Sequence, residues 1–256
     1  MELTEYIRTL LIVCPLVFFA GFVDSIAGGG GTISLPAYVA AGVPYHLALG
    51  TNKFSSTIGT CVSAGRFIKN GKAHLKALLV AVPAALAGSA AGASIALKIS
   101  EVYLQYTLVV MLPFLAVFVL KNKKFNDEGN KRVPSGLTLV LSALAGFAIG
   151  AYDGFFGPGT GTFLILVFNL VVGFDILTSS GCAKVINLAS NVAALATFLA
   201  AGSVVVPVGV CAALFGVAGN YLGSGLALKK GVKLIRPVFV FVLLVLMIKV
   251  VYDLVI

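Results

Sequence analysis

The chain has 256 residues, of which 59% are hydrophobic and 11% charged, and its mean hydropathy is +1.07. A soluble domain is about a quarter charged, so this composition excludes a water-soluble globule and places the chain in a lipid bilayer. The net charge of +9 does not indicate nucleic acid, because most basic residues lie in three short clusters beside apolar runs. This is the positive-inside pattern of membrane proteins, although it leaves an anionic partner on the basic face as a minor alternative.

Apolar runs follow one another along the whole chain. A bilayer core of about 30 Å needs roughly 20 helical residues, and two runs, 29–42 and 159–173, are too short to cross it comfortably. Because the runs are continuous rather than alternating, they predict helices and exclude a β-barrel. We therefore expect an all-α, polytopic membrane protein. The predicted segments are 7–27, 29–42, 46–65, 77–97, 102–120, 136–153, 159–173, 178–201, 204–228 and 237–256.

The sequence contains an internal duplication. Residues 21–31 read GFVDSIAGGGG and residues 150–161 read GAYDGFFGPGTG, so that Asp24 and Asp153 lie 129 residues apart. Further on, Lys53 and Lys184 are equivalent at a spacing of 131 residues. A duplicated membrane half is typical of transporters built from internal repeats. The spacing of 131 also relates Phe67 to Phe198, Gly88 to Gly219 and Gly92 to Gly223.

The distribution of charge predicts how the two halves are oriented. The segment near 66–76 is basic, whereas its equivalent near 198–204 carries no charge. Equivalent loops of opposite character indicate halves of opposite orientation, which five segments per half would produce. We expect a 5+5 inverted repeat with both termini outside the cytoplasm, and a 4+4 arrangement with eight full transmembrane helices is the alternative. The expected parts are a first repeat at 1–120, a polar cytoplasmic linker at 121–135 and a second repeat at 136–256.

Each repeat carries one aspartate and one lysine within its apolar segments: Asp24 and Lys53, then Asp153 and Lys184. A charge at the bilayer centre costs about 3 kcal/mol on insertion scales, so four such charges at matched places need a reason. Either each aspartate pairs with a lysine to hold helices together, or the lysines neutralise an anionic substrate and an aspartate carries a coupling proton.

Glycine clusters and polar residues surround these charges. Glycines that break a helix expose backbone N–H groups, and the following half-helix points its positive N-terminus at the break; close helix packing is the alternative reading. Polar side chains beside the lysines would bind substrate oxygens or cross-link helices. The candidate substrate-binding residues, besides the two lysines, are Gly28, Gly29, Gly30, Gly31, Gly157, Gly159, Gly161, Thr51, Asn52, Asn187 and Asn191.

The motifs GFVDSIAGGGG, ALGTNK at 48–53, YDGFFGPGTG at 152–161 and AKVINLASN at 183–191 resemble the TauE/SafE family of sulfite and organosulfonate exporters. The resemblance covers nearly the whole chain and both repeats. It implies secondary transport of small sulfur-containing anions, usually outward, across the bacterial inner membrane. It is closest to the branch of probable bacterial inner-membrane transporters.

These observations predict a secondary transporter of a small anion of the sulfite or sulfonate type, with the bilayer as its environment. An anion channel on the same scaffold is the alternative. The sequence shows no zincin motif, no serine–histidine pair at useful spacing and no acidic metal cluster, so we expect no enzymatic activity, no cofactor and no metal. Small-residue faces are compatible with a homodimer as well as with packing inside one protomer.

Overall fold

The computed structural model describes residues 3–100, 102–103, 135–231, 233–235 and 237–238. This part of the chain is all-helical and contains no strand, which confirms the predicted fold class. The helices are α1 (Leu3–Ala27), α2 (Gly31–Ala40), α3 (Tyr45–Lys69), α4 (Leu75–Ala96), α6 (Ser135–Phe155), α7 (Thr160–Leu166), the π-helix η1 (Val167–Val171), α8 (Ile176–Ala200) and α9 (Val206–Lys230).

Within the described residues, five helices, α1, α4, α6, α8 and α9, are long and apolar enough to cross a membrane. Helix α3 has 25 residues as well, but it carries many polar side chains on the face that lines the site. The predicted segments 102–120 and 237–256 and the predicted linker 121–135 fall almost entirely outside the described residues. The repeat boundaries therefore stay a prediction.

The glycine-rich sequences break the helices as expected. Helix α1 ends at Ala27, and the chain turns back so that Gly30 packs against the carbonyl oxygen of Ala20 and the Cβ of Asp24. The following helix α2 has only 10 residues, about 15 Å at 1.5 Å per residue. In the second half, α7 and η1 together form an equally short segment, Thr160–Val171. Both segments are therefore too short to cross a bilayer alone.

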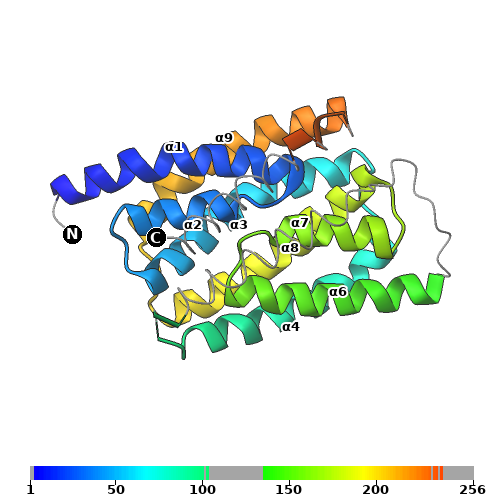
Figure 1. Ribbon diagram of the computed structural model, residues 1–256, viewed down its shortest axis with the longest axis horizontal. Coiled ribbons are helices and arrows are strands. Elements are labelled where there is room, and N and C mark those ends of the chain that lie inside the picture. The colour runs from blue at the N-terminus through cyan, green and yellow to red at the C-terminus, as the bar shows by residue number, and fades with distance from the viewer. Residues whose placement is uncertain (1–2, 101, 104–134, 232, 236, 239–256) are drawn as a thin grey trace, which may run out of the picture.

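The helices form three layers, with α1 and α9 on one side, α4 and α6 on the other, and α3 and α8 between them (Figure 1). Glycines set the close approach in both outer layers. A side chain at Gly92 of α4 would overlap the backbone of α6 at Ala151, and one at Gly223 of α9 would overlap the backbone of α1 at Phe22. Small residues at these crossings allow backbone-to-backbone packing.

Contacts between the two halves occur in matched pairs in which the partners are exchanged. Gly50 packs against the backbone of Ser203, and its equivalent Gly181 packs against the backbone of Lys72. In the same way, the backbone N–H of Val205 donates to Thr51 Oγ1, and that of His74 donates to Cys182 Sγ. Such exchange is what a two-fold relation between the halves produces.

The register of contacts also gives the helix directions. Helix α1 runs parallel to α9, because Tyr6 contacts Pro207 while Phe22 contacts Gly223. Helix α3 runs antiparallel to α8, because Lys53 contacts Asn191 while Phe67 contacts Gly181. Similar contacts place α1, α3 and α9 in one direction and α4, α6 and α8 in the other. Repeat-equivalent helices thus run antiparallel, which favours an inverted repeat; five segments per half stays a prediction.

The π-helix η1 accompanies a difference in length between the repeats. The spacing of equivalent residues grows from 129 at the aspartates to 131 at the lysines, so the second copy has two extra residues between them. Helix η1 lies within this stretch. A π-turn holds more residues than an α-turn, and it takes up part of the insertion before α8 begins.

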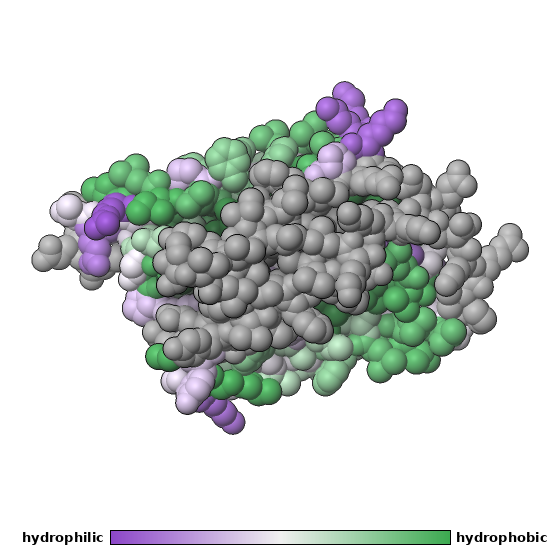
Figure 2. All heavy atoms as spheres, viewed as in Figure 1, coloured by the Kyte–Doolittle hydropathy of each residue, from purple (hydrophilic) through white to green (hydrophobic). Residues whose placement is uncertain are grey.

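Basic residues gather at one end of the bundle. Arg66 and Lys69 end α3, Lys229 and Lys230 end α9, and these two helices run parallel with Arg66 donating to the backbone oxygen of Tyr221. Much of the visible described surface between the ends is hydrophobic (Figure 2). This pattern suits a bundle that contacts lipid along its sides and water at its ends.

Candidate functional site

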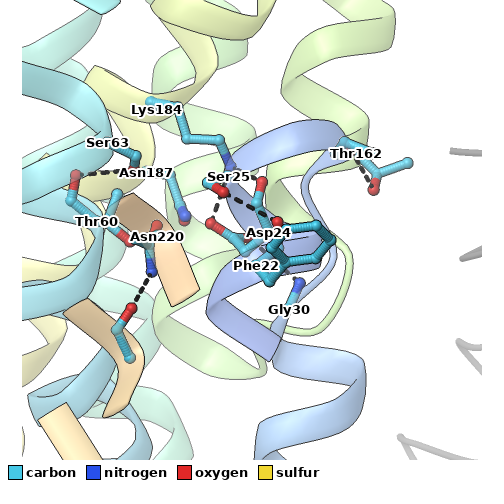
Figure 3. A network of polar contacts seen from close by, with 12 residues as sticks. Phe22, Asp24, Ser25, Gly30, Thr60, Ser63, Thr162, Lys184, Asn187 and Asn220 are labelled. Atoms are coloured by element: carbon cyan, nitrogen blue, oxygen red, sulfur yellow. Dashed lines mark hydrogen bonds and ion pairs between the residues drawn. The ribbon is translucent and has the colours of Figure 1, made fainter. Parts of the chain in front are cut away.

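The four charges of the duplicated motif meet in two ion pairs at the centre of the bundle. Lys184 of α8 lies 2.8 Å from the Asp24 carboxylate near the end of α1 and also donates to the Asp24 backbone oxygen (Figure 3). Lys53 of α3 lies 2.8 Å from the Asp153 carboxylate near the end of α6. Each aspartate is therefore neutralised by the lysine of the opposite repeat.

Asp153 is held by further side chains. Ser190 donates to its Oδ2 at 2.7 Å and Thr160 donates to its Oδ1 at 2.8 Å. Lys53 in turn donates to Asn191 Oδ1 at 3.0 Å. The carboxylate is 2% exposed and the lysine side chain 3%. Several donors are what a buried carboxylate requires to remain charged.

Asp24 has fewer partners. Besides Lys184, its carboxylate accepts one hydrogen bond from the backbone N–H of Gly30 at 3.2 Å. The Asp24 side chain is 14% exposed, whereas Lys184 is 0% exposed. The carboxylate thus contacts open space, while its lysine does not.

The two glycine-rich breaks touch each other beside these pairs. Gly28 has a positive φ of 75°, and a side chain there would overlap the backbone of Gly161 and Thr162. Thr162 donates to the backbone oxygen of Ala27 at 3.2 Å. The absence of a Cβ at Gly28 is therefore required for the two breaks to meet.

A central cavity lies where the breaks and the ion pairs meet; its atom-free space is about 520 Å³, a figure that includes the opening to solvent. Most of its wall is polar or glycine backbone. It is lined by Val17, Ala20, Gly21 and Asp24 of α1; Gly29, Gly30, Gly31 and Ser34 at α2; Asn52, Lys53, Ser55, Ser56 and Thr60 of α3; Asp153, Gly157, Gly159, Thr160 and Gly161 at the second break; and Asn187, Asn191, Gly216 and Asn220 of α8 and α9.

The structure brings most of the predicted site residues to this cavity. Three of them do not line it. Lys184 lies behind Asp24, Gly28 packs against the second break, and Thr51 donates to Leu47 and accepts from the backbone of Val205. Whether the residues that do line the cavity bind substrate stays a prediction.

Sequence reasoning missed Asn220. Its amide nitrogen lies between α1 and α3, 2.7 Å from where a Cβ would stand at either Gly21 or Gly59. The available signal was an isolated asparagine in an otherwise apolar helix, at the position that corresponds to Ser89 in the first repeat. Ser34 and Thr60 also line the cavity without having been expected there.

Several amide groups at the cavity are available for a ligand. Asn187 makes no side-chain hydrogen bond to another described residue, and the buried Oδ1 atoms of Asn52 and Asn220 have no partner. Buried polar atoms are ordinarily paired, so this arrangement can bind a polar solute. A group of three or more histidine, cysteine, aspartate or glutamate side chains able to hold a metal was not found in the described ranges.

Comparisons with known proteins agree on the class of this chain. A probable membrane transporter protein, ORF9 from Sinorhizobium sp., is 39% identical over 258 residues, covering 98% of this chain and 95% of the relative. The probable membrane transporter protein YfcA of Escherichia coli K12 is 35% identical over 257 residues, with 97% and 95% covered. A probable membrane transporter protein of Haemophilus influenzae is 33% identical over 247 residues, with 96% of each chain covered.

No solved structure matches this chain. The model of the family described as "Sulfite exporter TauE/SafE" matches residues 13–250. With its membrane-capable helices and transporter relatives, the molecule is a multi-pass protein of the bacterial inner membrane. The chain belongs to the TauE/SafE family of membrane transporters.

Proposed function

We propose that this protein is a secondary transporter that exports a small sulfur oxyanion of the sulfite or sulfonate type, and that the central cavity is its substrate site. The observation that carries the proposal is the cavity itself, which lies where two glycine-rich breaks meet in a membrane bundle. Discontinuous helices near the midplane are where secondary transporters place their substrates.

The residues around the cavity suit an anion of no more than a few heavy atoms. Asn52, Asn187 and Asn191 come from the two central helices and offer amide N–H donors. The N-terminus of α2 begins at Gly31, where first-turn N–H groups have no intrahelical partner and favour negative charge. Lys53 supplies a positive charge at the cavity wall.

Because all four charges are paired, an anion that enters the cavity does not meet a large net positive charge. Each lysine is compensated by an aspartate, so the empty site is close to neutral. A neutral donor-rich site binds an anion without holding it so tightly that it cannot leave, as transport requires. We assign Lys53 and the asparagines to the wall that an entering anion meets first. In the empty site Lys184 is held by Asp24.

The basic end of the bundle supports an orientation. The positive-inside rule places the ends of α3 and α9 in the cytoplasm and the beginning of α1 on the opposite side. Alternating access would follow from movement of the outer layers, α1 with α9 and α4 with α6, against the central helices. Export is the direction that the family's description gives.

The test is transport of radiolabelled sulfite, sulfate and sulfoacetate in proteoliposomes under imposed gradients of pH and potential. We expect uphill movement of one of these anions, reduced at least tenfold by Lys53→Ala and by Asn187→Ala. Ser94→Ala is the matched control, because Ser94 is exposed and donates only within its own helix. Strictly downhill flux would instead indicate a channel, and no flux of any anion from folded protein would overturn the proposal.

A further inference from the structure

The two aspartates of the duplicated motif are equivalent in sequence but not in surroundings. Asp153 accepts from Lys53, Ser190 and Thr160 and is 2% exposed. Asp24 accepts from Lys184 and one backbone N–H and is 14% exposed to the cavity. One carboxylate is enclosed by side-chain donors, and the other is open to solute.

The difference comes from two positions of the repeat. Thr160 corresponds to Gly31 at the spacing of 129, and Ser190 corresponds to Gly59 at the spacing of 131. Both hydroxyl groups that hold Asp153 are thus replaced by glycine around Asp24. The space at Gly59 is taken by the amide of Asn220, whose equivalent in the other half is the smaller Ser89.

Charge compensation then limits how an anion can reach Lys184. This lysine is fully buried, and the Asp24 carboxylate lies between it and the cavity. Lys184 Nζ would lie only 3.5 Å from a Cβ at Gly161, a residue of the cavity wall. A buried charge left without a partner is strongly unfavourable, so Lys184 can leave Asp24 only when another anion takes its place.

The charged groups around Asp24 are few. Lys184 comes from α8, Lys53 of α3 interacts with it electrostatically, and Asp153 of α6 lies beyond Lys53. The residues that α2 and α9 contribute to this region, Gly30 and Asn220 among them, are uncharged. An incoming anion next to Asp24 would place two negative charges against one lysine unless the carboxylate gains a proton.

We infer that Asp24 is the site of the coupling proton, whereas Asp153 stays charged and keeps its pair with Lys53 at the cavity wall. A proton on Asp24 releases Lys184, which then binds the substrate anion. One proton and one doubly charged sulfite together carry one net negative charge, which the membrane potential of a cell drives outward. This inference rests on the proposed function, and it assigns different tasks to two residues that the sequence presents as equals.

The first experiment separates exchange from accumulation in proteoliposomes with radiolabelled sulfite. Asp24→Asn leaves Lys184 without an anionic partner until sulfite binds, so sulfite exchange at equal pH is expected to persist within about threefold. Accumulation driven by a pH gradient is expected to be lost. Asp153→Asn is expected to keep pH-driven accumulation in the fraction of protein that inserts and folds. If Asp153→Asn does not fold, Thr160→Ala, which removes one hydrogen bond to Asp153, is the milder substitute.

The second experiment transfers the hydroxyl partners of Asp153 to Asp24 in the other half. Gly31→Thr and Gly59→Ser, combined with Asn220→Ser to make room, give Asp24 the hydroxyl partners of Asp153. We expect pH-driven flux to fall at least tenfold, with a smaller fall in sulfite exchange. Each single substitution serves as a control for packing.

A third measurement needs no substrate. Infrared titration of the reconstituted protein should show the stretching band of a protonated buried carboxyl that disappears in Asp24→Asn and persists in Asp153→Asn. Loss of the band in Asp153→Asn instead, or pH-driven accumulation by Asp24→Asn, would overturn the inference. If sulfite does not move at all while the Asp24 band is present, the proposed substrate is wrong and the proton site stands.

Discussion

Lys184 holds both the carboxylate and the backbone oxygen of Asp24, a residue 160 positions earlier in the chain. The second pair, Lys53 with Asp153, also joins one repeat to the other. Each aspartate is therefore neutralised by a lysine of the other half.

The first prediction concerns stability. Lys184→Ala is expected to lower the free energy of unfolding by about 3 to 5 kcal/mol, because it leaves the Asp24 charge buried without its partner. The double variant Lys184→Gln with Asp24→Asn should recover most of this loss. Thermal unfolding in detergent measures both, with the exposed Lys76→Ala as control. A double variant as unstable as Lys184→Ala would contradict the charge argument.

The second concerns helix packing. Gly92→Ala places a methyl group against the backbone oxygen of Ala151, so α4 and α6 must separate, and we expect destabilisation of about 1 to 3 kcal/mol. Gly65→Ala in α3 meets nothing within 4 Å and should be neutral or stabilising by about 0.5 to 1 kcal/mol. Equal effects of both changes on the unfolding midpoint would argue against close backbone contact.

The third concerns orientation. Asn70 follows α3 at the basic end and Ala201 follows α8 at the opposite end, and both are exposed. In a variant without native cysteines, Ala201→Cys should react with an impermeant maleimide in intact cells. Asn70→Cys should react only after permeabilisation. The reverse pattern would invert the proposed orientation.

The fourth concerns substrate binding. Asn187 has no side-chain partner among the described residues, so Asn187→Ala should leave stability nearly unchanged. Loss of one hydrogen bond to a charged group is worth about 1.5 to 3 kcal/mol, which predicts an increase in KM of at least tenfold with a smaller change in kcat. Initial rates over a range of anion concentrations separate the two. An unchanged KM would remove Asn187 from the site.

Much of the fold could be predicted from the sequence, because the helices are as long as the apolar runs. The predicted segment 77–97 is observed as Leu75–Ala96, beginning where His74 Nδ1 accepts from the N–H of Ala77. The predicted segment 46–65 extends to Lys69, because the long Arg66 and Lys69 side chains lower the hydropathy without ending the helix. The two short helical segments, predicted at 29–42 and 159–173, could also be predicted from the length of their apolar runs.

The pairing at the site could not be predicted in the same way. Sequence spacing relates Asp24 to Asp153 and Lys53 to Lys184, but it does not say that each aspartate meets the lysine of the other repeat. That choice depends on the antiparallel packing of α3 against α8. The unequal enclosure of the aspartates could be predicted only in part. The two glycine-rich breaks differ at Gly31 and Thr160 in the sequence, but the importance of Gly59 follows only from the structure, in which its equivalent Ser190 donates to Asp153.

The exchange of partners between the repeats has a consequence for synthesis of the protein in the cell. At about 5 to 20 residues per second, the 160 residues that separate Asp24 from Lys184 take about 8 to 32 s to translate. During that interval the first aspartate has left the ribosome but its final partner has not. We therefore expect Asp24 to lack its lysine while the first half is inserted, and the final packing of the first half to wait for arrival of the second.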